Sequence, residues 1–212
     1  MVGRNEYWKQ TTNKEETMKI HVSKENIKLG KIANISFPQD SCQPDVPCKQ
    51  DCYTNKSYKM YPNTRKAWHE NYQYYLDDQE RFFRSIEDWL WKNKPSFFRW
   101  FVSGDIPSQS FFIGMDNIAD SFDKIKFLVF TKNHQLHFDS KNSNNLQVVL
   151  SMWTGWGRTD IHPNMRRAWV QTKDNQETRI PIDAIQCFGN CEKCGICFQL
   201  DGIGRDVFFM KH

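Results

Sequence analysis

The chain has no long hydrophobic segment. Its 212 residues contain no run of eighteen apolar residues, the length at which a membrane-spanning helix is expected. The first thirty residues are polar and charged, whereas a secretory signal peptide needs an apolar stretch. We therefore expect a soluble, cytoplasmic protein with no membrane partner.

Strong charge of one sign and internal repeats are also missing. The formal net charge is +4 at pH 7, with acidic residues interspersed among basic ones. This balance permits nucleic acid as a partner without pointing to it. Aromatic residues, in contrast, make up 15% of the chain, with 16 Phe and 8 Trp. Because that bulk can fill one core, we expect a single α/β metal-binding domain over residues 31–212, preceded by an N-terminal arm or hairpin over residues 1–30.

Cysteine is absent from most of the chain and concentrated in two short groups. The first cysteine group is Cys42, Cys48 and Cys52, and the second is Cys187, Cys191, Cys194 and Cys197. Cysteines two or three residues apart rarely have the geometry for a disulfide with each other, and the expected compartment is reducing. The sequence therefore predicts that both groups bind metal.

The spacing within the second cysteine group favours an iron-sulfur cluster. Structural zinc usually draws on two separated Cys-x-x-Cys pairs or on a Cys/His pair across a loop, and the group lacks that bipartite form. Three thiolates at two-residue spacing, with a fourth three residues away, are typical of ferredoxin-like ligation. We predict an iron-sulfur cofactor of the 4Fe-4S type, and zinc is the alternative.

The two groups differ in the number of thiols that they offer. Three thiolates leave one iron of a cubane-type 4Fe-4S cluster without a protein ligand, so that an outside ligand can bind there. Four thiolates leave no iron open. One or two clusters are therefore expected, the open one at the first group. A single structural site that borrows cysteines from both groups is the alternative, because thiolate-rich metal sites contribute directly to folding.

Hydrophobic periodicity predicts alternating strands and helices. A long helix is expected from about residue 63 to residue 94, and a second helix is capped by Ser108. Strands are expected at residues 31–37, 97–102, 125–131, 146–151, 168–172 and 179–185. This order predicts an α/β fold, either a partial (β/α) barrel or an open, mostly parallel sheet with helical crossovers, followed by a cysteine-rich C-terminal segment.

Four further residues are predicted to bind a cofactor, because ligands gather at the carboxyl ends of parallel strands. Gly104 allows close backbone approach and Asp105 supplies a carboxylate, which together suit an ammonium group. An ordinary strand-to-helix turn explains the same two residues. Ser151 and Trp153 follow a later strand, where the indole serves either as a flat wall for a cofactor ring or as packing.

The order of these parts is similar to a shortened radical S-adenosylmethionine domain. Several segments between about residues 27 and 200 also resemble the phage "gene product 88" proteins. These segments are Leu29-Gly30-Lys31-Ile32-Ala33-Asn34, Cys48 with Cys52-Tyr53, Val102-Ser103-Gly104-Asp105, Phe130-Thr131-Lys132, Ser151 with Trp153, and Cys191-Glu192-Lys193-Cys194-Gly195-Ile196-Cys197. The radical pattern Cys-x3-Cys-x2-Cys is not matched, since the spacers here are five and three residues, and Tyr53 follows the third cysteine instead of preceding it.

The resemblance implies a reaction class. In such proteins the open iron chelates S-adenosylmethionine, and Gly104 and Asp105 would lie near its methionine end. An electron donor would be the partner, and the host cytoplasm the compartment. A non-enzymatic zinc or iron-sulfur module that binds nucleic acid or a host protein is the competing hypothesis. The substrate does not follow from the sequence, because loops determine it.

Overall fold

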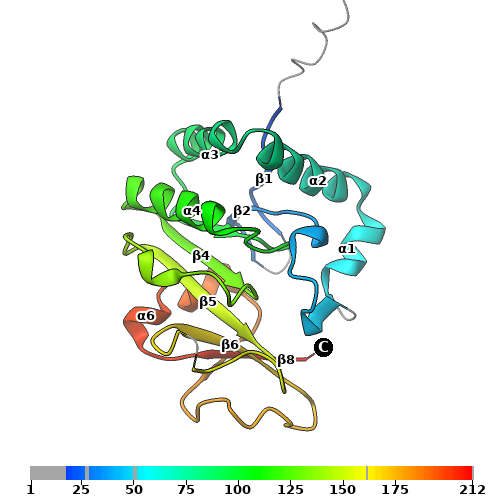
Figure 1. Ribbon diagram of the computed structural model, residues 1–212, viewed down its shortest axis with the longest axis vertical. Helices are drawn as coiled ribbons and strands as arrows, with labels where there is room; N and C mark the ends of the chain where they lie inside the picture. The colour runs from blue at the N-terminus through cyan, green and yellow to red at the C-terminus, as the bar shows by residue number, and fades with distance from the viewer. Residues whose placement is uncertain (1–17, 27–28, 50–51, 161, 212) are drawn as a thin grey trace, which may run out of the picture.

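The computed structural model describes residues 18–26, 29–49, 52–160 and 162–211. Over these residues the chain forms an eight-stranded open sheet in the order β1-β2-β3-β4-β5-β6-β8-β7 (Figure 1). The strands are β1 (Val22–Ser23), β2 (Ala33–Ile35), β3 (Phe97–Trp100), β4 (Lys126–Thr131), β5 (Leu146–Met152), β6 (Arg166–Gln171), β7 (Ile185–Gln186) and β8 (Val207–Met210). The helices are α1 (Thr54–Met60), α2 (Pro62–Asp77), α3 (Gln79–Asn93), α4 (Gln109–Ser121), α5 (Cys191–Cys194) and α6 (Leu200–Ile203).

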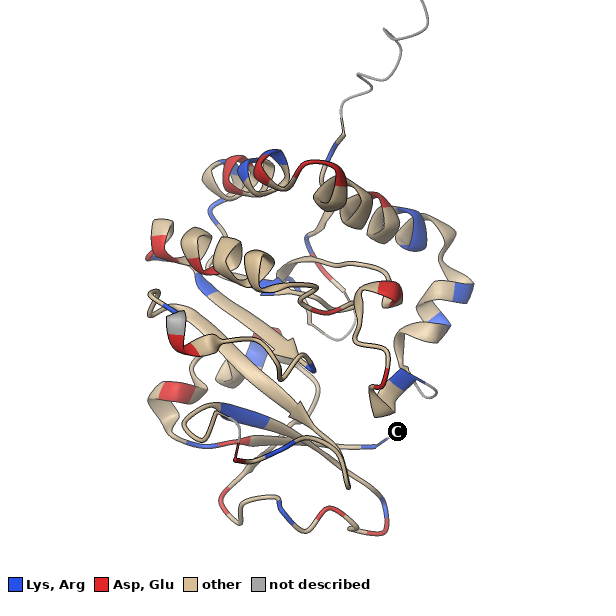
Figure 2. Ribbon diagram, viewed as in Figure 1, with Lys and Arg blue, Asp and Glu red and all other residues tan. Residues whose placement is uncertain are grey.

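The predicted fold class is confirmed. Only β1 pairs antiparallel, with β2, and the other pairings among the described strands are parallel. The central strand β5 is buried along its whole length and carries no charged residue, as expected of a parallel strand covered on both faces (Figure 2). Of the predicted N-terminal arm, residues 1–17 lie outside the described residues.

The two faces of the sheet carry different layers. Alternate strand residues point to opposite faces, and the helix face packs against α2, α3 and α4 (Figure 1). Its strand residues include Phe98, Trp100, Phe127, Val129, Val148 and Leu150. The opposite face, here called the cysteine face, packs Leu128, Val149, Ala168 and Val207 against Phe198 and Leu200 of the C-terminal segment.

The position of the C-terminal segment follows from strand order. The chain crosses the sheet in one direction from β2 to β6, but β8 lies between β6 and β7, so the step from β7 to β8 runs backwards. A right-handed crossover that reverses direction has to pass over the opposite face. The second cysteine group belongs to this crossover and therefore covers the face that α2, α3 and α4 leave open.

The start of α4 agrees with the prediction. Ser108 precedes the helix in an extended conformation, and its Oγ accepts a hydrogen bond from the Phe111 amide at 3.1 Å. This bond satisfies one of the backbone donors that a helix leaves unpaired at its first turn. The helix then buries Phe111, Met115 and Ile118 against the sheet.

The long helix predicted from residue 63 to residue 94 is wrong, because the structure divides it at Asp78. Asp78 is extended, with φ −153° and ψ 90°, and its carboxylate accepts from the Arg81 amide at 3.0 Å, so it caps α3. The break lets Tyr75 of α2 and Phe82 of α3 meet edge to face at 5.8 Å, and both rings contact Phe37. Aromatic packing outweighs helical continuity here.

The last predicted strand, 179–185, is also wrong in its bounds. Of that range only Ile185 is in a strand, and Pro181 lacks the amide that a central strand would donate. The strand that completes the sheet is β8, which the sequence analysis missed and which pairs with β6 and β7. Within the described part of the chain, no helix has the length and apolar character needed to cross a membrane.

Candidate functional site

One cavity of about 420 Å³ lies on the cysteine face, at the carboxyl ends of the strands. Its lining includes all three thiols of the first cysteine group and three of the second, namely Cys42, Cys48, Cys52, Cys187, Cys191 and Cys197. The structure thus brings together two groups that are far apart in the sequence. Cys194 is exposed and does not line the cavity.

The cysteines are free thiols without disulfides. Among the described residues, no three Cys, His, Asp or Glu side chains converge closely enough to hold a metal ion. Within each group, however, the thiols influence one another's pKa, as Cys48 and Cys52 do for Cys42. The match to a metal therefore rests on the chemistry of the donors, since six thiols at one cavity suit a thiophilic metal or an iron-sulfur cluster.

Burial makes these thiols hard to ionise. It raises the pKa of Cys42 to about 12, although the nearby Lys132 opposes the rise. Burial and then the neighbouring Cys187 and Cys191 raise the pKa of Cys197 to about 12 as well. A thiol in this state is protonated and a poor nucleophile at neutral pH. The raised pKa therefore disfavours nucleophilic catalysis by a lone cysteine, whereas a coordinating metal would itself remove the proton.

Serine side chains join the first cysteine loop to the loop after β3. Ser36 Oγ accepts from the backbone amides of Val102 at 3.0 Å and Ser103 at 3.4 Å. Five residues further on, Ser41 Oγ accepts from the Asp105 amide at 3.1 Å. The position of Cys42 therefore depends on the conformation of residues 102–105.

Gly104 lies where these two loops touch. Its φ is +83°, and a Cβ at this position would lie 2.5 Å from Ser41 Oγ and 2.8 Å from Phe37 Cβ. The close backbone approach predicted for Gly104 is thus made to the cysteine loop. Phe101, three residues earlier, has φ +57°, a strained conformation for a bulky residue. The loop is held in this shape by its contacts with the residues after β2.

We predict that Gly104→Ala destabilises the protein by about 2 kcal/mol or more, because positive φ costs about 1–2 kcal/mol for a non-glycine residue and the new methyl group clashes as well. Urea unfolding measures the loss. Gly155→Ala is the matched control, since Gly155 has φ +71° with nothing within 4 Å of its would-be Cβ. Equal losses in the free energy of unfolding in the two variants would show that the close contact between Gly104 and the cysteine loop does not contribute to the destabilisation.

Asp105 lies beneath the cavity and does not line it. The residue is fully buried, and its carboxylate accepts from the Ile106 amide at 2.8 Å, Thr131 Oγ1 at 2.7 Å and the Lys132 amide at 2.8 Å. The Lys132 ammonium lies 3.7 Å from the same carboxylate. In this structure the ammonium group that pairs with Asp105 is therefore that of Lys132.

Lys132 itself does line the cavity, beside the first cysteine group. Burial disfavours its charge, but Asp105 and then the thiols of Cys42 and Cys48 raise its pKa above the ordinary value. The residue is a permanent cation at physiological pH. The sequence analysis used Lys132 only as part of a resemblance, and its contact with Asp105 required the fold.

Ser151 and Trp153 line the cavity at the end of β5. His134 Nε2 donates to the Ser151 carbonyl at 3.0 Å, and burial lowers the pKa of this histidine, which keeps the ring neutral. Trp153 packs edge to face on Trp156 at 5.6 Å. The indole of Trp153 thus packs on a neighbouring ring while the residue lines the cavity, and its role toward a cofactor ring stays a prediction.

Arg179 holds this turn and was not found from the sequence. Its guanidinium donates to the carbonyls of Trp153 at 2.5 Å and Gly157 at 2.9 Å, and it pairs with the buried Glu177 at 2.7 Å. The hydrogen bond from Arg179 lowers the pKa of the Glu177 carboxyl. No local pattern marks the role of Arg179 in this turn, because the carbonyls that it holds, those of Trp153 and Gly157, are more than twenty residues away.

The second cysteine group is tied to the start of β2. Glu192 accepts from the Lys31 amide at 3.1 Å. Gly30 leaves room for this contact, since a Cβ there would lie 2.2 Å from the Glu192 carboxylate. The Leu29-Gly30-Lys31 segment and the Cys191-Glu192 segment therefore form one contact surface.

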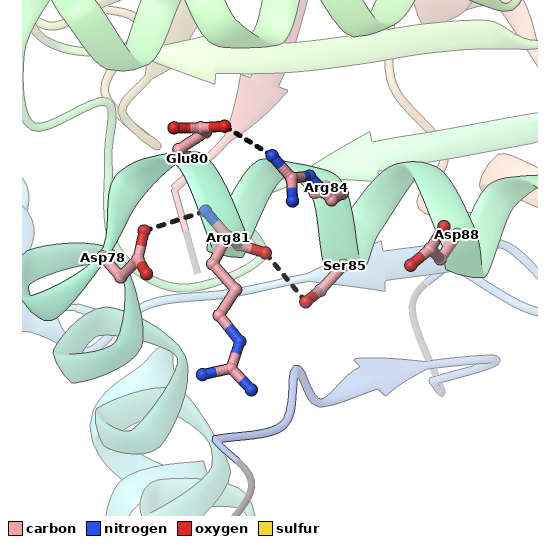
Figure 3. A pocket seen from close by; sticks show the side chains of 6 residues that line it. All are labelled: Asp78, Glu80, Arg81, Arg84, Ser85 and Asp88. Atoms are coloured by element: carbon pink, nitrogen blue, oxygen red, sulfur yellow. Dashed lines mark hydrogen bonds and ion pairs between the residues drawn. The ribbon is translucent and has the colours of Figure 1, made fainter.

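A second hollow, of about 320 Å³, lies on the outer helix layer (Figure 3). Its lining residues belong to α3 and its cap, and their contacts are those of a surface helix. Asp78 caps the helix, Glu80 pairs with Arg84, and Ser85 donates to the Arg81 carbonyl at 2.8 Å (Figure 3). Neither cysteine group contributes to this hollow, and we assign no site to it.

Comparison with known proteins adds one finding. A family model described as "Gene product 88" matches residues 7–199 of the chain. No curated protein matches the chain, and no solved structure matches it.

Proposed function

Because this chain belongs to the phage gene product 88 family, we propose that it is a phage iron-sulfur protein that acts in the cytoplasm of the host. The observation that carries the proposal is the convergence of six thiols from both cysteine groups on one cavity. Soft thiolate donors select iron-sulfur clusters, zinc or copper over magnesium and calcium. The ferredoxin-like spacing of the second group favours iron-sulfur among these.

Each cysteine group would have its own role. The first cysteine group belongs to a loop at the carboxyl ends of the strands. None of its three residues, Cys42, Cys48 and Cys52, is part of the hydrophobic core clusters of the described residues. Cys187, Cys191 and Cys197 pack against the core of the cysteine face, and Cys194 influences the pKa of Cys197 from the exposed side. The second group would hold a closed, structural cluster, while three thiols of the first would hold an open one.

The proposed reaction class is radical or redox chemistry. Cys42, Cys48 and Cys52 would hold the cluster, which when bound would supply one-electron chemistry for the reductive cleavage of S-adenosylmethionine, with the electron coming from an external donor. The chain itself would contribute the cavity, the aromatic wall at Trp153 and the charge of Lys132. Gly104 and Asp105 would act through the loop that they stabilise, given their contacts with Ser41 and Lys132.

Anaerobic purification tests the proposal. We expect a brown protein that contains iron and acid-labile sulfide, with a broad absorption band in the visible range. Reduction with dithionite in the presence of S-adenosylmethionine is then expected to release 5′-deoxyadenosine. A colourless protein with stoichiometric zinc and no sulfide would instead support the alternative, a non-enzymatic zinc module that binds nucleic acid or a host protein. Iron and sulfide without release of 5′-deoxyadenosine would restrict the function to redox chemistry.

A further inference from the structure

Arg99 is a buried charge on the floor of the cavity. It lies on β3 with its side chain on the cysteine face, and only 9% of the residue is exposed. The guanidinium stacks on the Phe130 ring, 4.9 Å from the ring centroid. In the part of the chain that the structure describes, the Nε atom of Arg99 has no hydrogen-bond partner. A buried guanidinium N–H without an acceptor is costly, and an anion bound in the cavity would supply one.

Other groups around Arg99 offer the same chemistry. Ser103 is another residue of the lining, and its Oγ is buried and likewise has no hydrogen-bond partner among the described residues. Lys132 and Lys211 add two further cations to the lining, while no described Asp or Glu contributes to it. Asp105 does not line the cavity, and its carboxylate lies 3.7 Å from the Lys132 ammonium.

Arg99 and Lys132 act on the same region of the cavity. The Tyr53 hydroxyl donates to the Val102 carbonyl. Tyr53, Arg99 and Lys132 all line this cavity. Ser103, the residue after Val102, lines it as well, so both cations and Ser103 share one cavity wall.

We propose that Arg99, Ser103 and Lys132 form a subsite for the carboxylate or phosphate group of an organic anion. A guanidinium binds either oxyanion through two parallel hydrogen bonds, and the Phe130 ring holds its plane in place. The remaining walls are apolar and include Trp153, Val170 and Phe209, so the body of the ligand is apolar or aromatic. The subsite deepens the proposed function. That the bound anion is the substrate of the protein rests on the proposed function, whereas anion binding itself does not.

The experiment compares charged ligands with a neutral one of the same shape. Benzoate, phenyl phosphate and benzamide are titrated calorimetrically into the purified protein at constant ionic strength. We expect saturable binding of benzoate or phenyl phosphate, with the preference between them identifying the oxyanion, and no saturable binding of benzamide. Arg99→Gln is expected to weaken anion binding about tenfold or more, since charge-assisted hydrogen bonds are lost. Arg84→Gln, at an exposed site on α3 (Figure 3), is the matched control and leaves binding unchanged.

Two results would overturn the subsite. One is equal binding of the anions and benzamide to the wild-type protein, and the other is unchanged anion binding by Arg99→Gln.

A second measurement separates anion binding from a role for Arg99 in metal binding. Arg99→Met replaces the unpaired charge with an apolar side chain, which in other proteins is neutral or stabilising. Without added anion, we expect this variant to melt at or above the temperature of the wild type and to retain its metal. Loss of metal together with intact anion binding in Arg99→Met would show that the Arg99 charge supports metal binding by the cysteines and not anion binding. The subsite would then be wrong. If the protein holds no iron but binds anions through Arg99, the proposed function fails and the subsite stands.

Discussion

Cys197→Ser is expected to lower the melting temperature by about 10 °C, which for a chain of this length corresponds to roughly 3–5 kcal/mol, and to remove the metal proposed for the second cysteine group. Cys197 is packed against the core of the cysteine face, and burial raises the pKa of its thiol to about 12. Since metal binding and folding are coupled where several ligands lie on one short segment, loss of this ligand releases the segment that covers the sheet. Thermal unfolding and metal analysis measure the two effects.

The comparison variants make this test specific. Cys42→Ser removes a ligand of the first group, which does not belong to a core cluster of the described residues, so it is expected to lose metal with a much smaller change in melting temperature. Cys194→Ser changes an exposed side chain of the same run and should fall between the two. After chelation, the difference between Cys197→Ser and the wild type should nearly disappear. A Cys197→Ser protein that melts like the wild type with its metal retained would contradict the structural role of the run.

Asp105→Asn is expected to cost about 3–5 kcal/mol, the loss typical of breaking a buried ion pair at one partner. The change keeps the shape of the side chain but leaves the mostly buried Lys132 ammonium without its countercharge at 3.7 Å. It also replaces one accepting oxygen with an amide that donates, whereas in Asp105 Oδ1 accepts from the Ile106 amide and Thr131 Oγ1 and Oδ2 accepts from the Lys132 amide. Urea unfolding gives the loss in the free energy of unfolding.

Asp116 offers a matched control for this effect. It is also a buried carboxylate, but it accepts its hydrogen bonds from neutral donors, the Asn142 amide and the Ser143 amide and hydroxyl. Asp116→Asn should therefore cost less, about 1–3 kcal/mol. The double change Asp105→Asn with Lys132→Met should recover part of the loss, because it removes the unpaired charge. No recovery, together with equal losses at Asp105 and Asp116, would show that the ion pair is not what stabilises the end of β3.

The sequence by itself determined the features that depend on neighbouring residues. Apolar runs at residues 125–131 and 146–151 identified β4 and β5 to within one residue, because a strand buried on both faces needs a continuous apolar stretch. Ser108 was recognised as a helix cap, since the donor that it serves is three residues away. The division of the thiols into two groups followed from spacing alone.

Only the tertiary structure decided the features that depend on residues far apart in the chain. The helical stripe continued through Asp78, and the break appeared only because Tyr75 and Phe82 must both reach Phe37. The backward step from β7 to β8 sent the second cysteine group to the face opposite α2, α3 and α4.

The candidate site depended on tertiary contacts in the same way. Gly104 and Asp105 were identified as site residues, but their contacts with Ser41 and Lys132 span 27 to 64 positions of the chain. Glu192 meets the Lys31 amide across 161 positions. Hydrophobic periodicity reports only which side of an element is apolar, whereas such contacts arise when elements pack. Arg99 shows the difference most clearly: in the sequence it interrupts an aromatic strand, and in the fold it is a buried cation at the floor of a cavity lined by thiols.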